Sequence, residues 1–202
     1  RTERGEDATL TFAELYDKVS QMQQVLKTAG VKSGDRVAGY LPNMPQSIVA
    51  MLATASLGAI WSSASPDFGV QGVLDRFGQI APKVLIAADG YYYNGKIVDC
   101  LGKLREIAAQ LPSVEKTLVV GFTTDKPALE GLKNPEVFDK ALSAVKPQEM
   151  TFERFPFNHP LCIMFSSGTT GAPKCIVHGA GGTLLQHLKE HQLQCDIRRD
   201  DR

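Results

Sequence analysis

One nine-residue stretch of the sequence combines the residue types that bind phosphate groups. Residues 166–174 read Ser-Ser-Gly-Thr-Thr-Gly-Ala-Pro-Lys, with four hydroxyl side chains, two glycines and one lysine. Glycine lets backbone N–H groups approach a ligand, hydroxyl groups donate further hydrogen bonds, and lysine supplies a positive charge. The stretch therefore predicts a phosphate cradle formed by Ser166, Ser167, Gly168, Thr169, Thr170, Gly171 and Lys174.

The spacing differs from the P-loop of nucleotide hydrolases. That motif has a glycine, four further residues, and then Gly-Lys followed by Ser or Thr. Here Pro173 stands five positions after Gly168, and Cys175 follows Lys174. Residues 175–177, Cys-Ile-Val, favour a strand rather than a helix, so no helix dipole is expected to assist. On residue types alone, a flexible loop between two hairpin strands is the competing interpretation.

The elements that position this loop alternate between strand and helix patterns. A capping box at Thr11 and Glu14, followed by apolar residues at helical spacing, predicts a helix over 12–29. We further expect helices at 45–57, 70–80 and 97–110, and strands at 36–41, 59–62, 84–87, 117–120 and 161–165. This alternation predicts an α/β fold, with helices packed on a largely parallel sheet. The continuous apolar run at 161–165 predicts a buried strand that leads into the loop.

Two regions interrupt the alternation. Five prolines punctuate the stretch from Phe122 to Pro160, which predicts an irregular segment at about 122–159 with one helical pattern at 138–145. Tyr91, Tyr92 and Tyr93 cannot share one face of a strand, so we interpret them as a surface loop.

Composition excludes several classes of protein. Lys plus Arg and Asp plus Glu number 22 each, so the charge balance favours neither nucleic acid nor an anionic membrane as a partner. The longest apolar stretch, 48–61, is shorter than the ~20 residues that span a bilayer. The charged N-terminus does not read as a secretory signal, and we expect a cytoplasmic protein. The four cysteines are widely spaced, so free buried thiols and no metal site are expected.

A second motif lies near the end of the sequence. His187, Glu190 and His191 fit the H-x-x-E-H pattern of inverted zinc peptidases, which requires a further ligand. The alternative, which we favour, is a solvated helix face opposite a buried face formed by Leu184, Leu185, Leu188 and Cys195.

Residues 165–174 resemble the signature loop of the AMP-forming acyl-CoA synthetase and adenylating enzyme superfamily in the aromatic lead, the hydroxyls, both glycines, the proline and the lysine. Residues 58–63, 65–69, 73–77 and 177–182 resemble the acetoacetyl-CoA synthetase branch in particular. The resemblance covers nearly the whole chain and is loosest at about 90–150.

The resemblance implies that residues 1–202 are a partial N-terminal, AMP-binding domain of an adenylate-forming enzyme. Such an enzyme activates a small carboxylic acid, here acetoacetate or a similar short-chain acid, with ATP and Mg²⁺ and transfers the acyl group to CoA. The loop residues would then bind the β- and γ-phosphates of ATP. The family's catalytic residues are expected downstream of Arg202.

The sequence begins without Met and ends soon after the loop. We therefore expect a piece of a longer protein that does not catalyse adenylation alone. The alternative is a non-catalytic truncated isoform that leaves apolar surface uncovered and acts by association with another chain.

Overall fold

A computed structural model of the chain describes residues 9–166 and 171–201. Its main sheet has seven strands in the order β7-β6-β3-β1-β2-β8-β9. Their bounds are β1 (Arg36–Tyr40), β2 (Ile60–Ala64), β3 (Val84–Ala88), β6 (Lys116–Val120), β7 (Pro135–Val137), β8 (Pro160–Ser166) and β9 (Lys174–Gly179). All neighbouring pairs are parallel except β8 and β9, which are antiparallel. The predicted α/β fold with a largely parallel sheet is confirmed.

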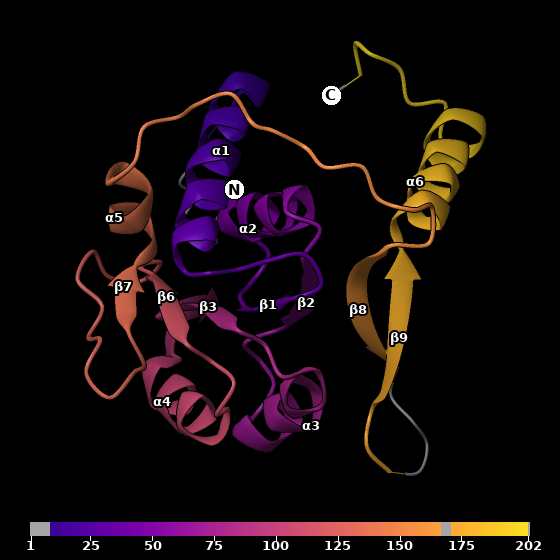
Figure 1. Cartoon of the computed structure of the whole chain (residues 1–202). Helices are drawn as coiled ribbons and strands as arrows, with labels where there is room; N and C mark the ends of the chain where they lie inside the picture. Colours follow the sequence, from indigo (N-terminus) through magenta and orange to yellow (C-terminus); the bar gives the residue numbers. More distant parts are fainter. Residues whose placement is uncertain (1–8, 167–170, 202) are drawn as a thin grey trace.

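Helices cover both faces of this sheet (Figure 1). The helices are α1 (Phe12–Thr28), α2 (Pro45–Ser56), α3 (Val70–Ile80), α4 (Leu101–Gln110), α5 (Phe138–Ser143) and α6 (Ala180–Lys189), and a π-helical turn, Glu190–Gln194, follows α6. Helices α1, α2 and α5 pack on one face, and α3 and α4 pack on the other. Each face therefore buries its own hydrophobic core, as the alternating pattern predicts.

Local sequence signals account for the helix starts. The Thr11 hydroxyl accepts a hydrogen bond from the Glu14 backbone N–H at 3.2 Å, and the Glu14 carboxylate accepts one from the Thr11 backbone N–H at 2.7 Å. The predicted capping box is thus confirmed. Pro45 occupies the first turn of α2, where its missing N–H leaves no bond unmade.

The prediction of a loop at the three tyrosines is wrong. They belong to β4 (Gly90–Tyr93), which pairs with β5 (Lys96–Asp99) in an antiparallel hairpin. Asn94 and Gly95 form its turn with φ angles of 49° and 72°, the conformation that Asn-Gly favours. The helix predicted over 97–110 consequently begins only at Leu101.

Burial at the last strands and helix also differs from expectation. In β8 only Ile163 is buried, although we predicted a buried strand. None of the residues of α6 is buried, and Leu184, Leu185, Leu188 and Cys195 are all exposed rather than packed inward. The apolar pattern of α6 is real, but no described element covers that face.

The segment after α5 is held by side chains of α1. The Ser20 hydroxyl donates to the Gln148 carbonyl oxygen at 2.6 Å, and the Gln21 amide donates to the carbonyl oxygens of Leu142 and Val145. Figure 1 shows this segment passing α1 and α2 before it enters β8. In addition to the predicted helix at α5, the region contains the short strand β7.

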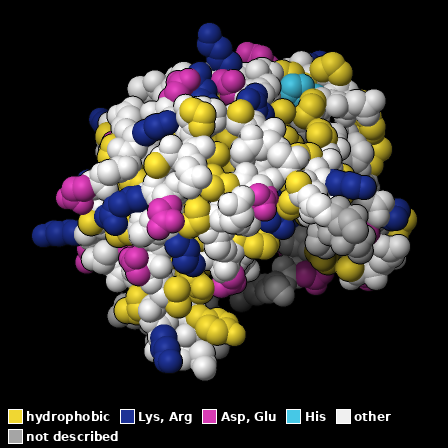
Figure 2. All heavy atoms as spheres, turned by 90° about the horizontal axis from the view of Figure 1, so that it is seen from below, with side chains coloured by type: hydrophobic (Ala, Val, Ile, Leu, Met, Phe, Trp, Pro, Cys, Tyr) yellow, Lys and Arg dark blue, Asp and Glu magenta, His cyan; other side chains and the backbone are white. Residues whose placement is uncertain are grey.

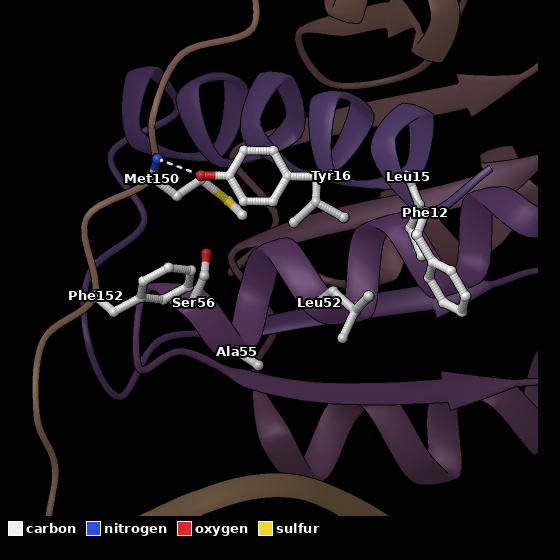
Figure 3. A pocket seen from close by; sticks show the side chains of 9 residues that line it. Phe12, Leu15, Tyr16, Leu52, Ala55, Ser56, Met150 and Phe152 are labelled. Atoms are coloured by element: carbon white, nitrogen blue, oxygen red, sulfur yellow. Dashed lines mark hydrogen bonds between the residues drawn. The ribbon is translucent and has the colours of Figure 1, made fainter. Parts of the chain in front are cut away.

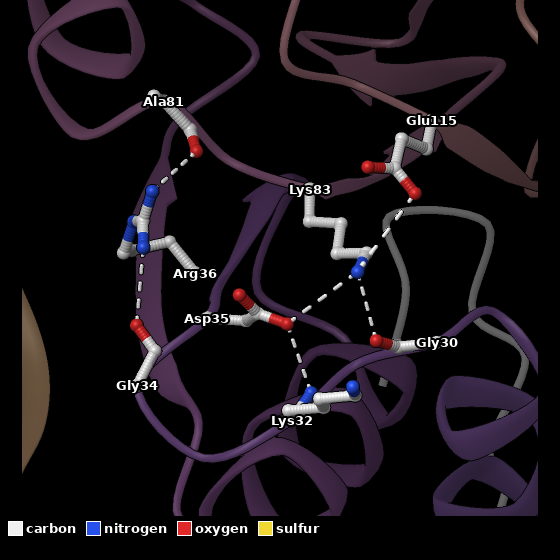
Figure 4. A network of polar contacts seen from close by, with 8 residues as sticks. All are labelled: Gly30, Lys32, Gly34, Asp35, Arg36, Ala81, Lys83 and Glu115. Carbon is white, nitrogen blue, oxygen red and sulfur yellow. Dashed lines mark hydrogen bonds and ion pairs between the residues drawn. The ribbon is translucent and has the colours of Figure 1, made fainter.

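A polar network fixes the amino-terminal ends of the central strands (Figure 4). The Lys83 ammonium lies 3.6 Å from the Asp35 carboxylate and 3.8 Å from that of Glu115, and it donates to the Gly30 carbonyl oxygen. The Arg36 guanidinium donates to three backbone carbonyl oxygens, including that of Ala81. These charges are paired within the fold and hold strand starts together.

Candidate functional site

The candidate phosphate loop closes the hairpin formed by β8 and β9. Ser166 ends β8 and pairs with Lys174 at the start of β9, so these two residues form the mouth of the loop. The segment after Lys174 is a strand, as its residue types predict. Ser167, Gly168, Thr169 and Thr170 lie outside the described residues.

The described part of the loop offers room and positive charge. Gly171 has a φ of 104°, a conformation that side chains rarely adopt, and, its chain neighbours aside, no atom of the described residues lies within 4 Å of the position that its Cβ would occupy. Lys174 is exposed, and none of the described acidic residues forms an ion pair with it. By contrast, the Lys83 and Lys116 ammonium groups are both paired with carboxylates. The Lys174 ammonium is therefore the charged group at the loop that remains available to an anion.

Strand β8 joins the rest of the sheet over a short distance. Its pairing with β2 is the bridge between Trp61 and Cys162, supported by a hydrogen bond of 2.8 Å from the Ser62 hydroxyl to the Ile163 carbonyl oxygen. Strands β8 and β9 form one edge of the sheet (Figure 1).

Helix α3 holds the exit of the loop. The Gln79 amide nitrogen donates to the Pro173 carbonyl oxygen at 2.8 Å, and its amide oxygen accepts from the Cys175 thiol, with a sulfur–oxygen distance of 3.5 Å. Sequence reasoning missed Gln79, since it lies 94 residues before Pro173 and belongs to no motif of its own.

A second loop, residues 65–69, leaves the carboxyl end of β2 next to β8. Carboxyl ends of adjacent parallel strands are where such sheets bind ligands. The hydroxyls of Tyr91 and Ser65 both donate hydrogen bonds to the Asp67 carboxylate and lower the pKa of that carboxyl. The hydrogen bond from the Tyr91 hydroxyl is the larger cause. The same bond raises the pKa of Tyr91 to about 12. Asp67 is thus an ionised group held by two hydroxyls.

The backbone of the second loop is fixed by Tyr40. Its hydroxyl lies 2.9 Å from the carbonyl oxygens of both Pro66 and Phe68, and burial raises its pKa well above the usual range. The Arg76 guanidinium lies over the Phe68 ring, 4.3 Å from its centroid. These contacts give the 65–69 and 73–77 segments structural roles.

A separate apolar cavity of about 450 Å³ lies between α1, α2 and the segment after α5 (Figure 3). It is lined by Phe12, Leu15, Tyr16, Val19, Leu52, Ala55, Ser56, Met150 and Phe152. The Tyr16 hydroxyl accepts a hydrogen bond from the Met150 backbone N–H at 3.0 Å. The described candidate phosphate-binding residues, Ser166, Gly171 and Lys174, do not line this cavity.

The described residues do not form a zinc site around the H-x-x-E-H motif. The rings of His187 and His191 stack with centroids 5.9 Å apart, and the Glu190 carboxylate accepts a hydrogen bond from the Gln186 amide. Across residues 9–166 and 171–201, no group of three or more His, Cys, Asp or Glu side chains is placed to hold a metal ion. The four cysteines are free thiols, but the expectation that they are buried is wrong except for Cys100, since Cys162 is half-buried and Cys175 and Cys195 are exposed.

The surface is mixed in character. On the face that Figure 2 shows, positive and negative side chains are interspersed with hydrophobic ones. Within the described part of the chain, no helix combines the length and apolar character needed to cross a membrane.

Comparison with known proteins identifies the family. The model of the AMP-binding enzyme family matches residues 2–202. The chain belongs to the AMP-binding enzyme family. The expected resemblance is therefore confirmed, and the match extends through both hairpin strands that carry the candidate loop.

Several relatives of this AMP-binding chain are acetoacetyl-CoA synthetases. The chain is 54% identical to the acetoacetyl-coenzyme A synthetase of Rhizobium meliloti (strain 1021) over 203 residues, covering 98% of this chain and 31% of that protein. It is 47% identical to the acetoacetyl-CoA synthetase of Rattus norvegicus over 206 residues, covering 100% of this chain and 31% of that protein.

The fold agrees with a solved acetoacetyl-CoA synthetase from Streptomyces lividans. The TM-score is 0.91 at 43% identity, over 98% of this chain and 30% of that chain. This AMP-binding chain thus spans about a third of the length of the proteins that it matches. It has the fold of an N-terminal part of such an enzyme.

Proposed function

We propose that the loop from Ser166 to Lys174 binds the β- and γ-phosphates of ATP, as part of an acid–thiol ligase that acts on acetoacetate or a similar short-chain acid. The observation that carries this proposal is the loop itself, a Gly- and hydroxyl-rich connection between two hairpin strands that ends in a lysine with no ion pair among the described residues, within a chain 54% identical to an acetoacetyl-CoA synthetase. Residues 1–202 would then be a partial AMP-binding domain.

The chemistry that such an enzyme performs needs strong positioning of ATP. A carboxylate oxygen of the acid attacks the α-phosphorus, the bond to the β-phosphate oxygen breaks, and pyrophosphate leaves with the electron pair. The CoA thiol then displaces AMP from the acyl-adenylate. Carboxylate oxygen is a poor leaving group and AMP is a good one, which is the reason for activation.

The loop residues would serve the first step. Backbone N–H groups near Gly168 and Gly171, and the hydroxyls of Ser166, Ser167, Thr169 and Thr170, would donate hydrogen bonds to phosphate oxygens. The Lys174 ammonium would offset the charge that grows on departing pyrophosphate. No residue described here is assigned to attack by CoA.

Magnesium enters this proposal only as the partner of ATP. The described residues supply no cluster of acidic side chains for a Mg²⁺ site, so the residues present do not fit a resident ion. No step is derived through the metal. Small-molecule acid, ATP and CoA are the proposed ligands, and a cytosolic location is proposed for the protein.

The test has two parts. Calorimetric titration of the 202-residue chain with MgATP should give saturable binding that Lys174→Ala weakens. Acetoacetate-dependent exchange between ATP and pyrophosphate should stay at the level of the Lys174→Ala variant, because we propose that this chain alone lacks the adenylation machinery. Absence of any MgATP binding would overturn the phosphate-loop proposal, and exchange well above the variant would overturn the proposed inactivity.

A further inference from the structure

The contact between α3 and the hairpin carries an inference beyond the loop itself. The register of β8 with β2 consists of the single pair Trp61 and Cys162, and Phe165 further along β8 packs, partly buried, against the core on the α3 side. The pairing of β8 with β9 does not itself attach β9 to α3. A direct contact between the exit of the loop and α3 therefore adds a second point of attachment.

Gln79 supplies that contact with both ends of its amide. The amide nitrogen donates to the Pro173 carbonyl oxygen at 2.8 Å and also lies 2.6 Å from the Asp75 carbonyl oxygen within α3. The amide oxygen accepts from the Cys175 thiol. Because the two hairpin partners flank Lys174, the contacts act on the residue that supplies the loop's charge.

We infer that Gln79 is a positioning residue for the phosphate loop: its side-chain amide clamps Pro173 and Cys175 and so holds Lys174 where it meets phosphate. The inference rests on the proposed function for its ligand, but the clamp can be tested without any ligand. The Asp75 and Pro173 carbonyl oxygens can only accept, so they require the nitrogen end of the Gln79 amide, and the Cys175 thiol then donates to its oxygen end.

The experiment compares Gln79→Met with Gln71→Met in the 202-residue chain. Methionine is unbranched, neutral and of similar length, so the substitution removes the two polar ends without adding charge. Gln71 is the matched control because it also lies exposed on α3 and bonds Asp75 but makes no described contact with the hairpin. Amide hydrogen exchange at Lys174 and Cys175 measures the clamp, and titration with inorganic tripolyphosphate measures its effect on binding.

We expect Gln79→Met to accelerate exchange at Lys174 and Cys175 and to weaken tripolyphosphate binding about threefold to tenfold, which corresponds to the loss of one neutral hydrogen bond. The thermal unfolding midpoint should stay within the range of Gln71→Met, since Gln79 is exposed. A merely structural role would instead shift that midpoint together with affinity. Cys175→Ser keeps a hydrogen-bond donor and should preserve the affinity for tripolyphosphate. Cys175→Ala removes the donor and should weaken that affinity. In the double variant with Gln79→Met, Cys175→Ala should cause no further loss.

Two results would overturn the inference. One is unchanged exchange at Lys174 and Cys175 in Gln79→Met, whatever the affinity does. The other is an equal effect from Gln71→Met. If the parent chain fails to bind tripolyphosphate, the proposed function fails, while faster exchange in Gln79→Met alone would still support the clamp.

Discussion

The Asp89 carboxylate accepts hydrogen bonds from both the backbone N–H and the hydroxyl of Thr123, each at 2.9 Å. It also accepts from the backbone N–H groups of Phe122 and Thr124, and the side chain is only 2% exposed. Asp89 follows β3 and Thr123 follows β6, so this one carboxylate ties the turn after β6 to the carboxyl end of the neighbouring strand β3.

Asp89→Asn should destabilise the chain by about 1–3 kcal/mol, because an amide NH₂ would face N–H and O–H donors and leave buried groups unsatisfied. Urea unfolding followed by circular dichroism measures the change. The neighbouring exposed residue offers a matched control, Asp125→Asn, for which we expect a change within about 0.5 kcal/mol. Equal stability of the two variants would contradict the role given to Asp89.

Gly121→Ala should also be destabilising, by about 1–3 kcal/mol. A Cβ on Gly121 would lie 2.4 Å from the Thr124 carbonyl oxygen, a backbone atom that the Asp89 turn prevents from moving away. Gly78→Ala in α3 has open space around its Cβ and should instead stabilise the helix by about 0.5–1 kcal/mol. The same substitution should thus lower the free energy of unfolding at one site and raise it at the other. Denaturant unfolding measures both changes, and changes in the same direction would contradict this prediction.

Tyr91→Phe should raise the pKa of Asp67 toward its ordinary value of 3.8, since the Tyr91 hydroxyl is the main cause of the depression. Carbon-detected NMR titration of the Asp67 carboxyl measures this. Ser65 still donates, so the rise should be partial. Tyr93→Phe, at a more exposed ring of the same strand, should leave that pKa unchanged.

The directions of the Asp67 and Tyr91 pKa shifts determine how the stability of the fold depends on pH. Because the pKa of Asp67 is lower in the folded state, its contribution to stability is present above about pH 3.8 and is lost as the pH falls through the folded value. Because the pKa of Tyr91 is raised from 10.0 to about 12, its contribution is present below pH 10 and is lost as the pH rises through about 12. Tyr91→Phe should remove the dependence caused by the Tyr91 hydroxyl and reduce that caused by Asp67, since Ser65 still donates to the Asp67 carboxylate.

Lys174→Ala should weaken tripolyphosphate binding about tenfold to a hundredfold, the effect of losing one charged contact. Titration calorimetry measures the affinity, and the loss should shrink as salt screens the parent's charge. Lys96→Ala removes an exposed lysine from the β4–β5 hairpin and serves as the control. A loss of affinity in Lys96→Ala equal to that in Lys174→Ala would indicate nonspecific attraction.

Local signals made much of the fold predictable. These signals depend on residues that are close in sequence, as in the capping box at Thr11, the proline at position 45 and the short apolar strands. A few residue types at the right spacing are therefore enough to predict the element. The Asn94-Gly95 turn is an equally local signal, and it predicts a hairpin, whereas face alternation in the preceding tyrosines suggests a loop. The turn decides the structure, because an Asn-Gly turn joins two strands whichever side chains their faces carry.

Long-range contacts limited the prediction of the site. The loop itself could be predicted from its residue types, whereas its support by Gln79 depends on a contact between residues 94 positions apart. The exposure of Leu184 and Leu188 has a related cause. An apolar helix face shows that packing against another element would be favourable, but the sequence of the helix does not show which element packs there.

The most direct test of the central claim is an NMR titration of the isotope-labelled 202-residue chain with MgATP. Binding at the proposed loop predicts saturable shift changes that centre on the amides of Ser166, Gly171 and Lys174 and that weaken in Lys174→Ala. Changes centred instead on the apolar cavity beside Tyr16 and Leu52, or no saturable change at all, would contradict the account.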